Sequence, residues 1–173
     1  MEAKIYVGTY GKYNNGSLFG EWIDLTQFAD KEDFYKACKK LHKQERDPEY
    51  MFQDFDGILS DMPKNWVSES HISEEVFTFL AHFSDDEDKS EAFLNWVSSA
   101  GYTGDFQYLL SQFEDAYYGE YDSPKAFAEH LVDDTGVLKK MESLSYYFDY
   151  EAYARDLFLT DFTYLDGIVY RKL

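Results

Sequence analysis

The chain is poor in cysteine, in basic residues and in long apolar segments. Its single cysteine, Cys38, excludes an internal disulfide framework and favours a reducing, cytoplasmic compartment. No segment approaches the roughly 20 apolar residues that are needed to span a bilayer. Residues 1–10 also lack the basic and then apolar pattern of a secretory signal. We therefore expect a cytoplasmic protein that neither crosses a membrane nor is secreted.

Lysine and arginine number 16, against 34 aspartate and glutamate residues, so the net charge is -18. Such a charge disfavours direct binding to nucleic acid and to anionic membranes, because both attract Lys and Arg. Acidic chains are often disordered, but this one contains 16 Tyr, 15 Phe and 3 Trp. That apolar surface is enough to offset the entropy of ordering, so we expect a folded protein that tolerates strong self-repulsion.

Catalytic and cofactor motifs are also missing. The chain contains no dinucleotide-binding fingerprint, phosphate-binding loop or nucleophile elbow, and its four histidines show no metal-binding spacing. The run Asp86-x-Asp88-x-Ser90 begins like a calcium loop, but Glu91 stands where the turn needs glycine and Val97 where a bidentate Glu belongs. We therefore expect no catalytic residue, no metal site and no cofactor.

The hydrophobic patterns predict an α+β protein with three segments. Residues 1–63 contain 12 acidic and 8 basic residues and read as a three-stranded sheet with a helix. Residues 64–104 contain 8 acidic and 2 basic residues and read as helical. Residues 105–173 contain 14 acidic and 6 basic residues and read as α+β, so most of the charge imbalance lies after the first segment.

Local signals place the elements of the first segment. Strands are expected at Lys4–Tyr10, Glu21–Leu25 and Met51–Phe55, and the Gly- and Asn-rich Gly11–Gly20 is expected to form a turn. Asp30 is the expected N-cap of a helix.

Later segments carry their own start and stop signals. N-caps are expected at Ser73, at Asp105 and at Ser123 before Pro124, and Ser84–Glu87 matches a capping box. A short helix is expected at Asp149–Asp156. Strands are then expected at Phe158–Leu165 and Ile168–Tyr170, joined by the hairpin dipeptide Asp166-Gly167.

Clustered carboxylates are the remaining functional signal. One interpretation is a set of solvated helix faces. The other is that they imitate DNA, which carries one negative charge per roughly 1.7 Å of duplex, so that 18 charges match about 30 Å of DNA and a dimer about 60 Å. The clustered residues are Asp85, Asp86, Glu87, Asp88, Glu91, Glu114, Asp115, Glu120, Asp122, Glu129, Asp133 and Asp134.

Several runs of the chain resemble the ArdA family of antirestriction proteins. The similarity extends from about residue 4 to about residue 172. The runs are Ile5–Asn14 (IYVGTYGKYN), Gly16–Leu18 (GSL), Gly20–Trp22 (GEW), Asp47–Asp54 (DPEYMFQD), Tyr147–Leu157 (YFDYEAYARDL) and Phe162–Gly167 (FTYLDG).

The resemblance implies an elongated, acidic homodimer of three small domains, encoded by mobile genetic elements. Such proteins imitate bent B-form DNA and occupy the DNA groove of the methyltransferase core of type I restriction-modification enzymes. It also implies dimerisation through the C-terminal domain, near an antirestriction motif that would correspond to Val137–Tyr150. The residues of that stretch are apolar enough for either an interface or a domain core. They are Val137, Leu138, Met141, Leu144, Tyr146, Tyr147 and Phe148.

Two other classes of protein fit the composition. A carboxylate-based hydrolase would show a concave pocket with a few perturbed carboxylates. An acidic interaction domain of another complex would need its charge only for solubility or docking. A DNA mimic, in contrast, would spread its carboxylates over one continuous face.

Overall fold

The computed structural model describes residues 1–140 and 142–173, without the side chains of Lys140, Glu142 and Leu144. Helices and antiparallel strands both occur along this part of the chain, which confirms the predicted α+β class. The chain divides into two compact units, Met1–Leu109 and Leu110–Leu173. The first unit holds both of the first two predicted domains, so their separation stays a prediction, as does an elongated arrangement.

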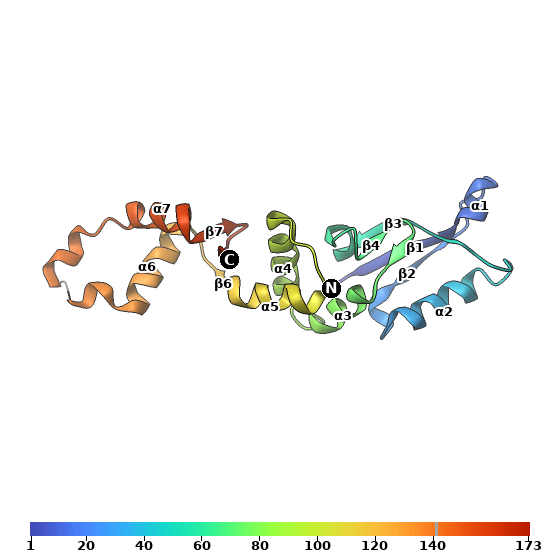
Figure 1. Cartoon of the computed structure of the whole chain (residues 1–173), viewed down its shortest axis with the longest axis horizontal. Helices are drawn as coiled ribbons and strands as arrows, with labels where there is room; N and C mark the ends of the chain where they lie inside the picture. The colour runs from blue at the N-terminus through green and yellow to red at the C-terminus, as the bar shows by residue number, and fades with distance from the viewer. Residues whose placement is uncertain (141) are drawn as a thin grey trace. The chain divides into compact units, whose positions relative to one another are not determined.

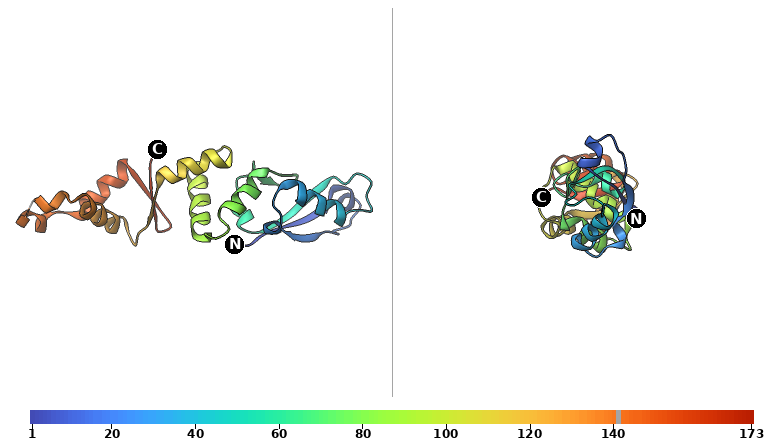
Figure 2. Two further views of the ribbon diagram at one scale, coloured as in Figure 1. Left: turned by 90° about the horizontal axis from the view of Figure 1, so that it is seen from below. Right: turned by 90° about the vertical axis from the view of Figure 1, so that its right-hand side faces the viewer.

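The first unit is built around an antiparallel sheet with the order β2-β1-β3 (Figure 1). Ile5 of the central strand is paired with Ile23 on one side and Phe55 on the other. Helix α2 lies alongside this sheet in the views of Figures 1 and 2, and its buried Phe34 ring lies 5.9 Å from the Phe52 ring. The bounds of these elements are β1 Ala3–Thr9, α1 Tyr10–Asn14, β2 Glu21–Asp24, α2 Lys31–Leu41 and β3 Tyr50–Gly57.

An aromatic cluster forms the second half of this unit. The buried Trp66 ring lies 6.0–6.4 Å from the rings of Phe79, Phe93 and Phe106. Each such pair contributes roughly 0.5–1.5 kcal/mol beyond the area that it buries. The elements here are β4 Val67–Ser68, β5 His71–Ile72, α3 Glu74–His82 and α4 Glu87–Ala100, with short 3-10 turns at Leu25–Gln27 and Ile58–Asp61.

The second unit packs two helices on a three-stranded antiparallel sheet with the order β6-β8-β7. Its core contains Phe127, Phe162 and Val169, against which Tyr121 and Phe158 pack. Helix α5, Phe106–Ala116, begins in the first unit and ends in the second. The other elements are β6 Tyr117–Glu120, α6 Pro124–Thr135, α7 Tyr150–Thr160, β7 Phe162–Leu165 and β8 Ile168–Arg171, with 3-10 turns at Val137–Lys140 and Glu142–Tyr147.

The predicted helix starts are mostly confirmed. The Asp30 carboxylate accepts a hydrogen bond from the Asp33 N–H at 2.9 Å, and the Ser123 hydroxyl accepts one from the Ala126 N–H at 3.1 Å. The Asp105 carboxylate caps α5 by accepting a hydrogen bond from the Tyr108 N–H at 2.9 Å. Ser73 lies at the N-cap position of α3 as expected, but its side chain makes no capping hydrogen bond. Gly167 follows Asp166 in the turn between β7 and β8, so the predicted hairpin is also confirmed.

The predicted capping box at Ser84 is wrong, because Asp86 caps α4. Its carboxylate accepts a hydrogen bond from the Lys89 N–H at 3.1 Å. Residues 83–86 form a turn after α3, because the Asp86 N–H donates a hydrogen bond to the Phe83 carbonyl at 3.1 Å. Ser84 therefore lies inside that turn, two residues before the cap.

Two predicted boundaries are corrected. The segment predicted as a turn from Gly11 begins with helix α1, because the Thr9 hydroxyl caps it by accepting from the Lys12 N–H at 3.3 Å. Helix α7 continues to Thr160, so Phe158 is helical rather than extended. The Phe158 ring packs on the Phe127 ring at 5.7 Å, and this tertiary contact outweighs its strand preference.

Candidate partner-binding surface

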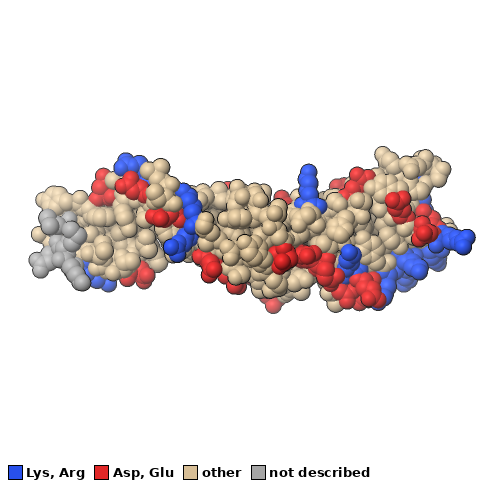
Figure 3. Space-filling model, viewed as in Figure 1, with Lys and Arg blue, Asp and Glu red and all other residues tan. Residues whose placement is uncertain are grey.

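All twelve clustered carboxylates are exposed. Five of them, Asp85–Asp88 and Glu91, lie at the start of α4 in the first unit. The other seven lie on α5, β6, α6 and the segment between the last two, in the second unit. Figure 3 shows Asp and Glu side chains on the visible face of both units. Among the described side chains, ion pairs join Glu87 to the Met1 amine at 3.2 Å and Glu129 to Lys125 at 4.0 Å.

The carboxylates of α4 have a clear role in folding. Asp86 is the N-cap, and Glu87 and Asp88 lie in the first turn, where the positive end of the helix dipole favours negative charge. Charges placed this way typically contribute about 0.3–1 kcal/mol each at low ionic strength. This cluster is therefore explained in part by the stability of its own helix.

The carboxylates at the ends of α5 and α6 have the opposite relation to their helices. Glu114 and Asp115 lie in the last turn of α5, and Asp133 and Asp134 lie in the last turn of α6. Neither last turn contains a basic residue. Negative charge is unfavourable at this end of a helix dipole, so these four side chains oppose helix stability. Glu129 and Asp133 add a like-charge pair four residues apart.

A shallow acidic pocket also lies in the second unit. It has a volume of about 610 Å³ and is lined by Glu120, Asp122 and Asp166 together with Tyr121 and Tyr164. In the residues that the structure describes, no group of three His, Cys, Asp or Glu is arranged to hold a metal ion.

The predicted interface segment presents three apolar side chains to solvent. Val137, Tyr146 and Tyr147 are 57%, 89% and 85% exposed. Leu138 is buried, and Phe148 is half-buried against Tyr150 and Tyr153, with ring centroids 4.9 and 5.4 Å away. Met141 and the side chain of Leu144 lie outside the described part of the chain. The role of the whole set in dimerisation stays a prediction.

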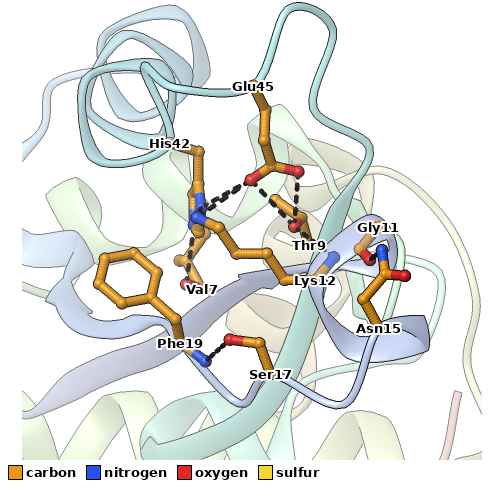
Figure 4. A network of polar contacts seen from close by, with 9 residues as sticks. All are labelled: Val7, Thr9, Gly11, Lys12, Asn15, Ser17, Phe19, His42 and Glu45. Atoms are coloured by element: carbon orange, nitrogen blue, oxygen red, sulfur yellow. Dashed lines mark hydrogen bonds and ion pairs between the residues drawn. The ribbon is translucent and has the colours of Figure 1, made fainter.

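A polar network in the first unit was not anticipated from the sequence (Figure 4). The Lys12 ammonium donates to His42 Nδ1 at 2.8 Å and forms an ion pair with Glu45 Oε1 at 3.1 Å. His42 is buried, and its Nε2 donates to the Val7 carbonyl at 3.2 Å. The Thr9 hydroxyl donates to the Glu45 carboxylate at 2.9 Å. The network thus ties α1 to the end of α2.

The pKa values of two groups bear on reactivity. Partial burial acts to raise the pKa of Glu45, but hydrogen bonds from Lys12 and Thr9 and the Lys12 charge outweigh it and lower that pKa below its ordinary value. Burial raises the pKa of the Cys38 thiol to about 12. Because the thiolate is the nucleophilic form, Cys38 is inert near neutral pH.

In the described residues, the longest apolar helical stretch falls short of what a membrane crossing requires. Taken together, the fold and the surface define an acidic α+β protein whose candidate site is an exposed array of carboxylates.

Comparison with known proteins identifies the family. The profile of the antirestriction proteins (ArdA) matches residues 5–170, nearly the whole chain. The protein therefore belongs to the ArdA family of antirestriction proteins, which is not a catalytic family. A search of curated protein sequences found no significant match.

Proposed function

We propose that this antirestriction protein acts as a DNA mimic. Its carboxylates take the place of DNA phosphates in the groove of the methyltransferase core of a type I restriction-modification enzyme, and so block restriction and modification. The observation that supports this most directly is the placement of Glu114, Asp115, Asp133 and Asp134. These side chains are exposed and lie where the helix dipole disfavours them, so the fold gains nothing from their charge.

Competition with duplex DNA tests the mechanism. The purified protein should displace a labelled duplex from a type I methyltransferase core. The core should bind either the protein or the duplex, but not both at once. Affinity should fall with salt, because exposed charge pairs are screened beyond roughly 10 Å at 0.1 M ionic strength. Association should be fast at low salt because complementary fields steer it. Simultaneous binding of protein and DNA to the same core would contradict the proposal.

Affinity should also be distributed over many carboxylates. An exposed charge pair is worth only about 0.2–1 kcal/mol, so no single neutralisation should abolish inhibition. Asp122→Asn is the most informative single change, because Asp122 lines the acidic pocket that a carboxylate-based hydrolase would use. Complete loss of inhibition by this variant, with its fold intact, would favour a discrete site over mimicry.

The proposal includes a homodimer formed through the segment around Val137, Tyr146 and Tyr147. Homodimer interfaces are more apolar than ordinary surface, and these three side chains are largely exposed. Tyr146→Asp with Tyr147→Asp should therefore raise the monomer fraction in analytical ultracentrifugation. Leu18→Asp is the matched control, because Leu18 is 70% exposed in the other unit. A double variant as dimeric as the control at micromolar concentration would place the interface elsewhere.

A further inference from the structure

A groove in the first unit follows the free edge of strand β2. The groove has a volume of about 870 Å³ and is lined by every residue of β2, Glu21–Asp24. Successive side chains of a strand point to opposite faces of the sheet, so a groove lined by four consecutive residues runs along the strand edge. Within the described residues β2 is outermost in the order β2-β1-β3. Its outer backbone groups are therefore available to an added strand.

The opposite wall of the groove is basic. It is formed by the last part of α2 and the residues after it, including Lys40 and Lys43. Residues 36–46 contain five basic residues and one acidic residue, in a chain with a net charge of -18. Figure 3 shows Lys and Arg gathered at the lower right, where Figure 1 draws α2. Lys36, outside the groove, is already paired with Glu32 and Asp33.

Two exposed aromatic side chains also line the groove. Trp22 and Phe19 are 46% and 49% exposed, and both line the groove. The Phe19 ring is held by an edge contact with His42 at 5.8 Å and by the Lys12 ammonium 4.2 Å from its centroid. Trp22 is held by an edge contact with the Tyr6 ring at 5.5 Å. Because these contacts fix the rings before binding, little side-chain entropy is lost when a partner packs on them.

We propose that this groove binds an extended acidic segment of a partner polypeptide, which adds to β2 as a further strand. Alternate side chains of that segment would be acidic and face Lys40 and Lys43. The side chains between them would be apolar and pack on the opposite face, where Trp22 lies. Main-chain hydrogen bonds to the edge of β2 supply affinity, and the basic wall supplies selectivity for acidic sequences.

The lining favours a peptide over nucleic acid. Glu21, Asp24 and Asp56 also line the groove and would repel an evenly charged phosphate backbone. Asp24 and Asp56 are both paired with Lys4 and so lie on one face of the sheet. A peptide strand can keep its carboxylates off that face, because its side chains alternate between the two faces.

The test measures binding of a synthetic peptide to the full chain. The peptide is fluorescein-labelled Asp-Val-Asp-Phe-Asp-Val-Asp-Ile, and its binding is measured by fluorescence anisotropy at low salt. The variant Lys40→Glu with Lys43→Glu should weaken binding at least tenfold. The matched control is Lys39→Glu with Lys64→Glu, which changes the net charge equally at two exposed lysines outside the groove. The control should stay within about twofold of the unmodified chain, and thermal melting should confirm that both variants fold.

Two further probes separate the possible occupants. The same peptide with alternate backbone amides N-methylated should lose binding, because it cannot pair with the edge of β2. A labelled ten-nucleotide oligothymidine should bind more weakly than the peptide. The proposal is overturned by equal binding of the two double variants, by indifference to N-methylation, by tighter binding of the oligonucleotide, or by no peptide binding up to millimolar concentration. No restriction enzyme is present in the assay, so its outcome is independent of the DNA-mimic proposal.

Discussion

The acidic residues of α4 and those of α5 and α6 differ in how they relate to their helices. Asp86, Glu87 and Asp88 lie at the start of α4, where the cap and the dipole both favour them. Asp133 and Asp134 lie in the last turn of α6, where the dipole opposes them. Equally exposed carboxylates can therefore differ in their contribution to stability. Those of α4 stabilise their helix, whereas the stability of α6 does not account for Asp133 and Asp134.

Glu45 also differs from the clustered carboxylates in how its charge is used. Glu45 is partly buried, is paired with Lys12 and accepts a hydrogen bond from Thr9. Its charge is used inside the molecule. Surface charge that is not used in this way increases self-repulsion, which destabilises the compact state. We infer that the unfavourable carboxylates of the second unit are retained for a partner.

The largest effect should follow from neutralising the second unit. Changing Glu114, Asp115, Glu129, Asp133 and Asp134 to the matching amides should weaken binding to a methyltransferase core by about 2 kcal/mol, or roughly thirtyfold, as the sum of small terms. Titration calorimetry at low salt measures this change. The control neutralises five exposed carboxylates of the first unit, Glu32, Asp47, Glu49, Asp54 and Asp61. Equal losses in the two variants would show that only net charge matters.

A smaller effect, on stability, should follow from removing the cap of α4. Asp86→Ala should destabilise the first unit by about 1 kcal/mol, because the Lys89 N–H loses its acceptor. Urea denaturation followed by tryptophan fluorescence reports this unit, since all three tryptophans lie in it. Asp86→Asn should retain most of the stability, and Asp85→Ala should change it by less than about 0.5 kcal/mol. If Asp85→Ala lost as much stability as Asp86→Ala, the loss could not be attributed to the capping hydrogen bond of Asp86.

Local sequence signals predicted much of the fold because they act over a few residues. Asp30, Ser123-Pro124 and Asp166-Gly167 fix a cap or a turn through their own side chains and backbone preferences. Strand β6 escaped prediction, because Tyr117–Glu120 becomes a strand only by pairing with β8, about fifty residues later. Tertiary pairing of this kind overrides local preference.

The candidate site was predictable in part. The clusters can be read from the sequence alone, and their exposure is expected because carboxylates are rarely buried without partners. Their relation to the helix dipoles depends on where α5 and α6 end, at Ala116 and Thr135. The network around His42 could not be inferred, because Lys12 and Glu45 meet only after α1 and α2 are placed beside the same strand.

Neutralising carboxylates in the last turn of α6 should have a still smaller effect, and should raise stability rather than lower it. Asp133→Asn with Asp134→Asn should stabilise α6 by about 0.5 kcal/mol, because two unfavourable dipole interactions are removed. Hydrogen exchange of peptides from residues 124–136 should slow about twofold at low salt, and the gain should shrink at high salt. Faster exchange in this variant would mean that the two carboxylates stabilise the helix, and the argument for a functional role would fail.

The smallest expected effect concerns the pH dependence of Glu45. Its pKa is lower in the folded state than the ordinary value of about 4.3 for glutamate, so the unfolded chain binds this proton more readily. The stability that Glu45 contributes is therefore complete above about pH 5 and is lost as the pH falls through the ordinary and then the folded pKa. Glu45→Gln should lower the stability of the first unit at neutral pH, and the difference from the unmodified chain should narrow toward pH 3. Tryptophan-monitored urea denaturation at several pH values measures that difference directly.

Glu49→Gln is the control, because Glu49 is exposed and its difference should not change with pH. If the Glu45→Gln difference were also constant with pH, the Lys12–Glu45 pair would contribute nothing through its charge, and Glu45 would belong with the carboxylates that the fold does not use.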